Sequence, residues 1–211
     1  MPNLEEENKA WEEYLYPDGE TLKNKLGITN PDELSQKEAE LSFVRLVELN
    51  ESPMTGDFDA NHLKRIHYYL FQDLYDWAGN FRNVNIAKNH SNFADYSRIQ
   101  EYLDYELALM NESFKKVHNK ELLANFVAEY YVVLLDIHPF RDGNGRTIRE
   151  FLREFVIEKT KTHDIGQYDL DWSLVDPKSI NEAMVNAKFF RWPIENEIKK
   201  AIVEIKEEKV L

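Results

Sequence analysis

The chain has 211 residues, a formal net charge of −13 at pH 7 and no cysteine. The lack of cysteine excludes disulfides, thiolate catalysis and cysteine-ligated zinc, and the acidic charge with dispersed Lys and Arg disfavours a nucleic acid partner. The N-terminus is acidic and polar, unlike a signal peptide, and no apolar run of about 18 residues could cross a membrane. We therefore expect a cytoplasmic protein of one domain without a membrane partner.

Helical periodicity dominates the first third of the chain. Residues Pro31–Glu51 place apolar side chains at helical spacing, and Thr29 or Asn30 can cap that helix before Pro31. A second helix is predicted over Asp59–Trp77, and the AGN that follows ends it. The apolar face of this second helix carries Leu63, Ile66, Leu70, Leu74 and Trp77.

The stretch from Phe81 to Phe93, FRNVNIAKNHSNF, has a different pattern. Val84 and Ile86 alternate with Asn83 and Asn85, and NHSN is typical of a turn. This alternation predicts a short β-hairpin, the only good strand candidate in the sequence.

Helices account for most of the remaining chain. Lys120–Asp136 is apolar enough to be a central buried helix, whereas 164–172 (DIGQYDLDW) is predicted to be a loop. The fold class is therefore mainly α, with one small hairpin. The helices predicted after the hairpin are 96–117, 120–136, 147–158, 176–186 and 194–210.

The most unusual stretch is DIHPFRDGNGRTIREF, from Asp136 to Phe151. Pro139 cannot continue the preceding helix, and Gly143 and Gly145 permit positive φ in the loop that follows. The amides of residues 143–146 can then point at one spot, at the N-terminus of the next helix, where the dipole favours an anion. The spacing predicts a polyphosphate cradle.

The charged residues of this stretch suit the same ligand. Arg146 and Arg149 are three apart, so they share a helix face and can bind phosphate oxygens. Asp142 supplies one carboxylate, which is a usual protein ligand for Mg²⁺ shared with nucleotide phosphates. His138, just upstream, has the chemistry of a general base for an incoming hydroxyl.

Each part also has an ordinary structural interpretation. A lone DGNG is a common turn, Asn144 can tolerate a left-handed conformation, and Arg141 can be a solvated loop residue. The combination of base, acid, paired glycines and paired arginines is much more specific. His62 and His67 are five apart and do not share a helix face well enough for a metal.

The stretch HPFRDGNGR from His138 to Arg146, extended by Arg149, resembles the signature of the Fic (filamentation induced by cAMP) family. TLKNKLGI, HYYLFQDLYDWAGNFRNVNIAK and YDLDWS are similar to its bacterial cell-filamentation branch. The resemblance implies a compact helical bundle with a β-hairpin flap over the active site. It further implies a single domain over 1–211, with a core at about 57–186, an N-terminal helical region 1–56 and a C-terminal helix 194–210.

The resemblance implies transfer of AMP from ATP to a hydroxyl of a target protein. His138 would deprotonate a Ser, Thr or Tyr hydroxyl that attacks the α-phosphate, and pyrophosphate would leave. Asp142 would hold Mg²⁺, with Mn²⁺ as an alternative ion. Gly143, Asn144 and Gly145 would cradle the phosphates, and Arg146 and Arg149 would neutralise their charge.

The flap is expected at residues 83–89, where the backbone of Asn83, Val84, Asn85 and Ile86 would register a target segment by strand addition. Lys88 is expected near the nucleotide. In the family, a lysine after this asparagine marks the branch that phosphorylates its target. Here Gly145 follows Asn144, so the resemblance favours AMP transfer over phosphorylation. Transfer of another phosphate-containing group, self-modification, and a non-catalytic nucleotide-responsive binding module stay open as alternatives. The intact His138 argues against the last.

Family members are commonly inhibited by a glutamate that pairs with the second arginine, here Arg149. Residues 29–33 fit most of the family motif that carries this inhibitory glutamate, which makes Glu33 the candidate. A first-turn glutamate at a helix N-terminus is the simpler interpretation of Glu33. Three regulatory arrangements stay open. A small antitoxin supplies the glutamate, residues 29–33 are a degenerate internal inhibitor, or the enzyme lacks this brake and is controlled by homo-oligomerisation.

Overall fold

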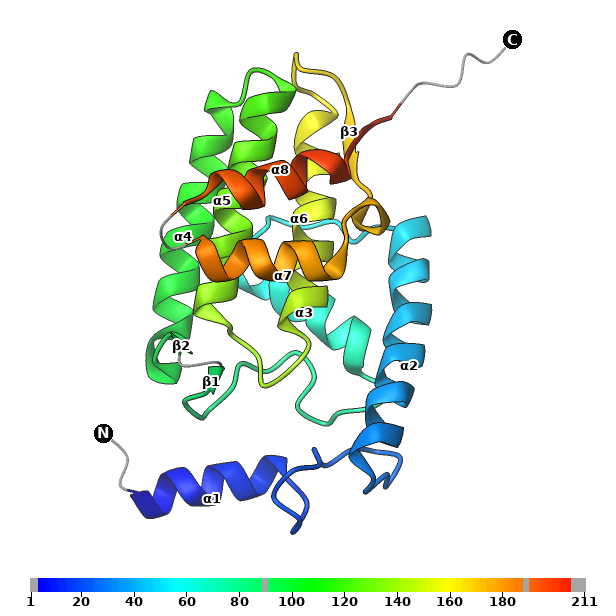
Figure 1. The fold of residues 1–211 in the computed structure, drawn as a ribbon, viewed down its shortest axis with the longest axis vertical. Coiled ribbons are helices and arrows are strands. Elements are labelled where there is room, and N and C mark those ends of the chain that lie inside the picture. Colours follow the sequence, from blue (N-terminus) through cyan, green and yellow to red (C-terminus); the bar gives the residue numbers. More distant parts are fainter. Residues whose placement is uncertain (1–3, 89–90, 188–189, 206–211) are drawn as a thin grey trace.

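The computed structural model describes residues 4–88, 91–187 and 190–205, which form a mainly helical bundle (Figure 1). Two short antiparallel pairs of strands accompany the helices: β1 (Ala87–Lys88) with β2 (Ser91–Asn92), and β3 (Tyr168–Leu170) with β4 (Ile202–Glu204). No helix in the described ranges is long and apolar enough to span a membrane. The helices are α1 (Leu4–Tyr14), α2 (Pro31–Glu51), α3 (Ala60–Phe71), α4 (Ile99–Ser113), α5 (Lys120–Ile137), α6 (Asn144–Thr160), α7 (Pro177–Asn186) and α8 (Trp192–Ala201).

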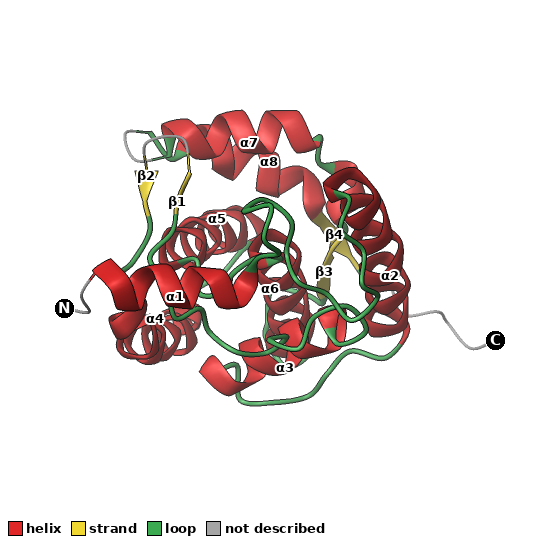
Figure 2. Ribbon diagram, turned by 90° about the horizontal axis from the view of Figure 1, so that it is seen from below, coloured by secondary structure: helices red, strands yellow, loops and turns green. Residues whose placement is uncertain are grey.

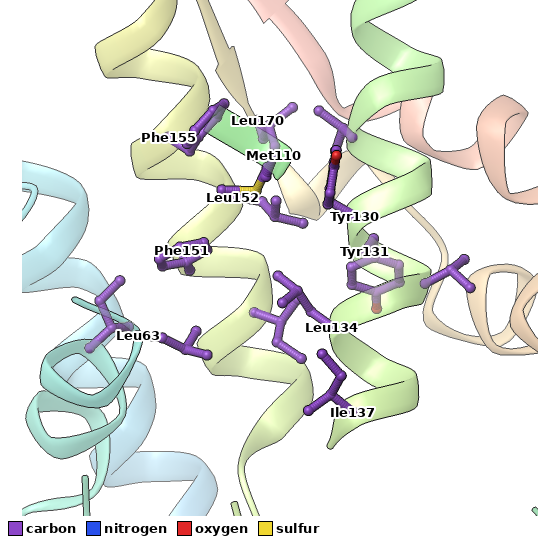
Figure 3. Close-up of a cluster of buried hydrophobic side chains, with 14 of the residues drawn as sticks. Leu63, Met110, Tyr130, Tyr131, Leu134, Ile137, Phe151, Leu152, Phe155 and Leu170 are labelled. Carbon is purple, nitrogen blue, oxygen red and sulfur yellow. The ribbon is translucent and has the colours of Figure 1, made fainter. Parts of the chain in front are cut away.

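The core lies between α5 and α6, which are the two central helices (Figure 3). Leu152 of α6 and Leu134 of α5 lie between these two helices, whereas Phe151 of α6 packs against Phe58 and His62, and Leu134, Phe151 and Leu152 are fully buried. Around this pair, α5 also packs against α4 and α8, and α6 packs against α3 and β3. The prediction of a central buried helix over 120–136 is therefore confirmed.

Side-chain caps fix where several helices begin. Asn30 accepts from the Glu33 amide at the start of α2, Asp59 accepts from the His62 amide at the start of α3, and Asp176 caps α7. The predicted bounds of α2 are confirmed, with Asn30 as the cap rather than Thr29. Pro31 stands in the first turn, where its missing N–H leaves no bond unmade.

Helix α3 ends at Phe71, six residues before the predicted Trp77. Beyond this point the chain continues in turns, such as the one closed by the bond from the Tyr75 amide to the Phe71 carbonyl, and tertiary hydrogen bonds join them. The carbonyl of Leu74 accepts from the amide of Lys25 at 2.8 Å, and the amide of Gly79 donates to His67. Leu74 is nevertheless buried, so the core position was predicted correctly although its secondary structure was not.

The sheet formed by β3 and β4 contradicts two predictions. Residues 168–170 lie in the segment predicted as a loop. Residues 202–204 lie in the segment predicted as a C-terminal helix, because the observed helix α8 already ends at Ala201. Tyr168 pairs with Glu204 and Leu170 pairs with Ile202. Three-residue strands joined over more than thirty residues leave no local pattern, so periodicity could not reveal them.

The hairpin, α1 and the loop between α5 and α6 lie at the same end of the bundle (Figures 1 and 2). The hairpin is shorter than predicted, because only Ala87 and Lys88 pair with Ser91 and Asn92. Val84 and Ile86 precede it as irregular chain. This end of the molecule is where the sequence motif lies.

Candidate active site

His138 lies at the end of α5 in a left-handed conformation, with φ of 50° and ψ of 62°. Its amide closes the helix by donating to the carbonyl of Leu134 at 3.0 Å. Its Nδ1 lies 3.1 Å from the carbonyl oxygen of Leu135, and a carbonyl can only accept, so the proton is on Nδ1. In the neutral imidazole the lone pair is then on Nε2, as a general base requires.

Phe93 covers one face of the His138 imidazole. The two rings are stacked, with centroids 3.9 Å apart and planes 15° apart. Because Phe93 follows β2 directly, the flap and His138 are in direct contact.

The loop between α5 and α6 is closed by the side chain of Asn144. Its Oδ1 accepts from the amide of Phe140 and its Nδ2 donates to the carbonyl of Phe140, both at 2.9 Å. Asn144 is buried, so its side chain holds the loop and only its backbone amide can reach a phosphate. Phe140 is fully buried and anchors the loop from beneath.

Gly143 and Gly145 differ in conformation. Gly143 has φ of 75° and precedes α6, whereas Gly145 lies in the first helical turn, so of the two only Gly143 uses the positive φ that glycine allows. Helix α6 starts at Asn144, three residues before the prediction. Because Gly143 has no side chain to cap the helix, the first amides of α6 have no side-chain cap and are available to an anion.

Asp142 is exposed at the edge of this helix N-terminus, and its Oδ1 accepts from the Gly143 amide at 2.6 Å. Within the described residues no three His, Asp or Glu side chains gather as a metal site. A single exposed carboxylate beside an anion site fits Mg²⁺ that takes most of its other ligands from nucleotide phosphates and water. Asp142 is thus suited to share a metal with a substrate.

His67, on α3, was not predicted to contribute to this site. Its Nδ1 accepts from the Gly79 amide at 2.8 Å, so Nε2 carries the proton and donates to the Asp142 carbonyl at 3.1 Å. The ring is fully buried and stacks on Phe140 with centroids 3.8 Å apart. His67 therefore supports the backbone at Asp142 from beneath. The sequence signal that could have revealed His67 is its spacing, which places it on the same face of the predicted helix as Leu63 and Leu70.

Burial lowers the pKa of His67 from 6.5 to about 3. Between these values the unfolded chain binds the extra proton and the folded chain does not, so stability falls as pH falls below 6.5. We expect this group to contribute a slope of at most about 1.4 kcal/mol per pH unit. Urea unfolding between pH 6.5 and 5 measures it. His67→Gln should flatten the slope, and equal slopes in both proteins would contradict this assignment.

Arg146 is held by residues of α2 and α3. Its guanidinium forms an ion pair with Glu38, donates to the Ser42 hydroxyl at 2.8 Å and lies 4.8 Å from the ring centre of Phe71. The Tyr75 hydroxyl also donates to Glu38, and burial and that carboxylate raise the pKa of Tyr75. Sequence reasoning missed Glu38, because it nominated Glu33 instead.

Glu38 places a negative charge next to the expected phosphates. Glu38→Gln keeps a polar partner for Arg146 but removes this charge, so we expect ATP to bind about three- to tenfold more tightly at low salt. Calorimetry with a non-hydrolysable ATP analogue measures the effect. Glu40→Gln is the matched control, since Glu40 lies on the same helix and pairs with the exposed Lys37. Unchanged affinity in Glu38→Gln would contradict the expectation.

Arg149 and Arg146 both open onto a groove of about 410 Å³, which also contains Trp172. The indole of Trp172 donates to the Arg149 carbonyl at 3.0 Å. Glu33 is exposed at the first turn of α2 and makes no ion pair within the described residues. The carboxylate that binds a motif arginine is thus Glu38, and its partner is Arg146 rather than Arg149.

The predicted flap residues divide into two groups. Asn83 and Asn85 are exposed and Ile86 is half-buried, so these can meet a target. Val84 is buried and its carbonyl accepts from Arg82, so neither its side chain nor that carbonyl is open to a target, and docking at Val84 stays a prediction. The backbone of Lys88 is in β1, while its side chain lies outside the described part of the chain, as does Asn89.

Comparisons with known proteins place this chain among known families and folds. Residues 57–156 match the model of the Fic/DOC family. The protein adenylyltransferase VbhT of Bartonella schoenbuchensis is 33% identical over 83% of this chain. The matched region is 36% of the length of VbhT, so this chain spans about a third of that relative. A probable protein adenylyltransferase, y4lH of Sinorhizobium fredii, is 31% identical over 85% of this chain and 90% of that protein.

A solved structure is similar over nearly the whole chain. It is the N-terminal Fic domain of a VirB-translocated effector of Bartonella quintana with bound ADP, with 28% identity and a TM-score of 0.79 over 92% of this chain and 95% of that one. The similarity therefore extends over both the sequence and the helical fold. This chain belongs to the Fic/DOC family.

Proposed function

We propose that this chain is a protein adenylyltransferase, which transfers AMP from ATP to a Ser, Thr or Tyr hydroxyl of a target protein. The observation that carries the proposal is a histidine with its Nδ1 proton held by a carbonyl, next to an uncapped helix N-terminus with two arginines. Relatives named as protein adenylyltransferases and a similar domain with bound ADP support it.

The residues divide the reaction between them. Nε2 of His138 takes the proton of the target hydroxyl as that oxygen bonds to the α-phosphorus. The bond from this phosphorus to the bridging oxygen breaks, and pyrophosphate leaves. The amides of Asn144 and Gly145 with the arginine side chains stabilise the phosphate charge. Mg²⁺ held at Asp142 would neutralise phosphate charge when bound.

Two cavities suit the two substrates. The groove with Arg146 and Arg149 can hold the triphosphate end. Phe93, which stacks on His138, and Ile137 line a second cavity of about 410 Å³ next to the flap. A target segment there would present its hydroxyl to His138 and pair with the exposed backbone near Asn85.

The arginine groove also supports a regulatory partner. Phe43 is 66% exposed and Val47 is 42% exposed on the α2 side of the groove, next to Arg149. A small antitoxin protein could cover this apolar face and bring a glutamate to Arg149. Such a pair would act in the cytoplasm, where ATP is available. Light scattering of the purified chain distinguishes this arrangement from homo-oligomerisation.

Labelling with two forms of radioactive ATP tests the proposal. The α-labelled nucleotide should transfer its label to a protein in a lysate, whereas the γ-labelled nucleotide should not. Label from γ-labelled ATP would instead indicate phosphorylation. ATP binding without label transfer from either form would support a non-catalytic binding module. Mass spectrometry of the labelled band then gives the target and the modified side chain.

A further inference from the structure

Arg82 is a buried cation at the base of the flap, and only 2% of its surface is exposed. Its guanidinium donates only to backbone carbonyls: Nε to His138 at 2.8 Å, Nη1 to Val84 at 2.7 Å, and Nη2 to Ala94 at 2.5 Å and Ile137 at 3.3 Å. No ion pair joins it to a carboxylate within the described residues. The Arg82 side chain thus donates to four carbonyl oxygens from three segments of the chain.

These acceptors belong to the two arms of the flap and to the end of α5. Val84 precedes β1 and Ala94 follows β2, while Ile137 and His138 end α5. Two backbone hydrogen bonds also join the flap region to the end of α5. The Arg82 amide donates to the Pro139 carbonyl at 2.9 Å, and the Ala94 amide donates to the Asp136 carbonyl at 3.3 Å. The guanidinium of Arg82 is therefore hydrogen-bonded both to the flap and to the backbone of His138.

The end of α5 favours a cation here. The last carbonyls of a helix lack intrahelical partners and carry its negative partial charge, so an arginine at this end is stabilised. Burial lowers the pKa of Arg82 to about 10, which leaves it charged at neutral pH. Lysine has a single ammonium group without the planar fork, so it cannot reach acceptors on both flap arms and on His138 together.

We propose that Arg82 is a positioning residue that fixes the flap relative to the imidazole of His138. It acts through the backbone of His138, Val84 and Ala94, and it touches neither ATP nor the target. This role rests on the proposed AMP transfer, in which the flap places the hydroxyl and His138 removes its proton. Losing the guanidinium would misplace these groups relative to each other while the phosphate contacts stay in place.

The test compares Arg82→Lys with Arg45→Lys. Arg45 is a half-buried arginine of α2 that bonds to Asp73 and Glu48, and it does not line the groove of Arg146 and Arg149. We expect Arg82→Lys to lower kcat for transfer to the target at least tenfold while KM for ATP changes less than twofold. Arg45→Lys should also lower Tm but leave kcat within twofold. A tenfold loss in both variants, or no loss in Arg82→Lys, would overturn the proposal.

Amide hydrogen exchange gives a second measurement that needs no activity. In Arg82→Lys the amides of Ala94 and His138 should exchange at least tenfold faster, while Arg45→Lys leaves both unchanged. If Arg82→Lys does not fold, the wild type decides, because these two amides should share one opening with the Arg82 amide. Separate openings would refute the coupling. Failure of the wild type to label any protein would instead refute adenylyl transfer and leave this measurement intact.

Discussion

Replacing His138 with alanine is expected to reduce AMP transfer by about 100-fold or more, since general base catalysis contributes about 10² to 10⁴ in rate. ATP should still bind, because the uncapped amides of α6, Arg146 and Arg149 are unaffected. The nucleophile would lose only the group that takes its proton. A loss in kcat without a loss in ATP affinity is therefore the expected signature.

The backbone of His138 requires a second variant. Its φ of 50° is left-handed, a conformation that costs an ordinary residue about 1–2 kcal/mol and that Asn tolerates better. His138→Asn should keep the stability of the end of α5 and still lack the base. Single-turnover transfer to the target and calorimetric ATP binding should be measured on both variants. Substantial transfer by His138→Asn would show that another group removes the proton.

Local sequence signals predicted what local bonds determine. Pro31 after Asn30 fixed the start of α2, and Pro139 with Gly143 marked the break between α5 and α6. Within the motif, residue type and spacing were enough to nominate His138 and Asp142, because their chemistry is carried by the loop itself.

Long-range bonds account for what the sequence could not reveal. Glu38 reaches Arg146 across 108 positions and His67 reaches Asp142 across 75, so neither contact has a periodic signature. Arg82 lies in a stretch that reads as a hairpin arm, and its burial depends on α5 meeting the flap. Each of these three residues supports the motif from another element, and only the packed structure brings them together.

Gly143→Ala is expected to be the most disruptive small substitution in the loop. A Cβ at this position would overlap ring carbons Cε2 and Cζ of Phe71, and φ of 75° adds strain for any side chain. Overpacking and left-handed strain together predict a loss of about 2–5 kcal/mol in unfolding free energy. Relief of the overlap would push the loop away from α3 and turn the first amides of α6 from the phosphates, so ATP binding and transfer should fall about 100-fold.

Gly27→Ala separates the two causes. Gly27 has φ of 69°, close to that of Gly143, but nothing lies within 4 Å of an added Cβ there. This variant should lose only the strain, about 1 kcal/mol, and keep ATP affinity and transfer within twofold. Urea unfolding and ATP titration should be measured on both proteins. If Gly143→Ala loses no more stability than Gly27→Ala and still binds ATP normally, then Phe71 does not form the floor of the phosphate loop, and the absence of a side chain at Gly143 serves only the turn.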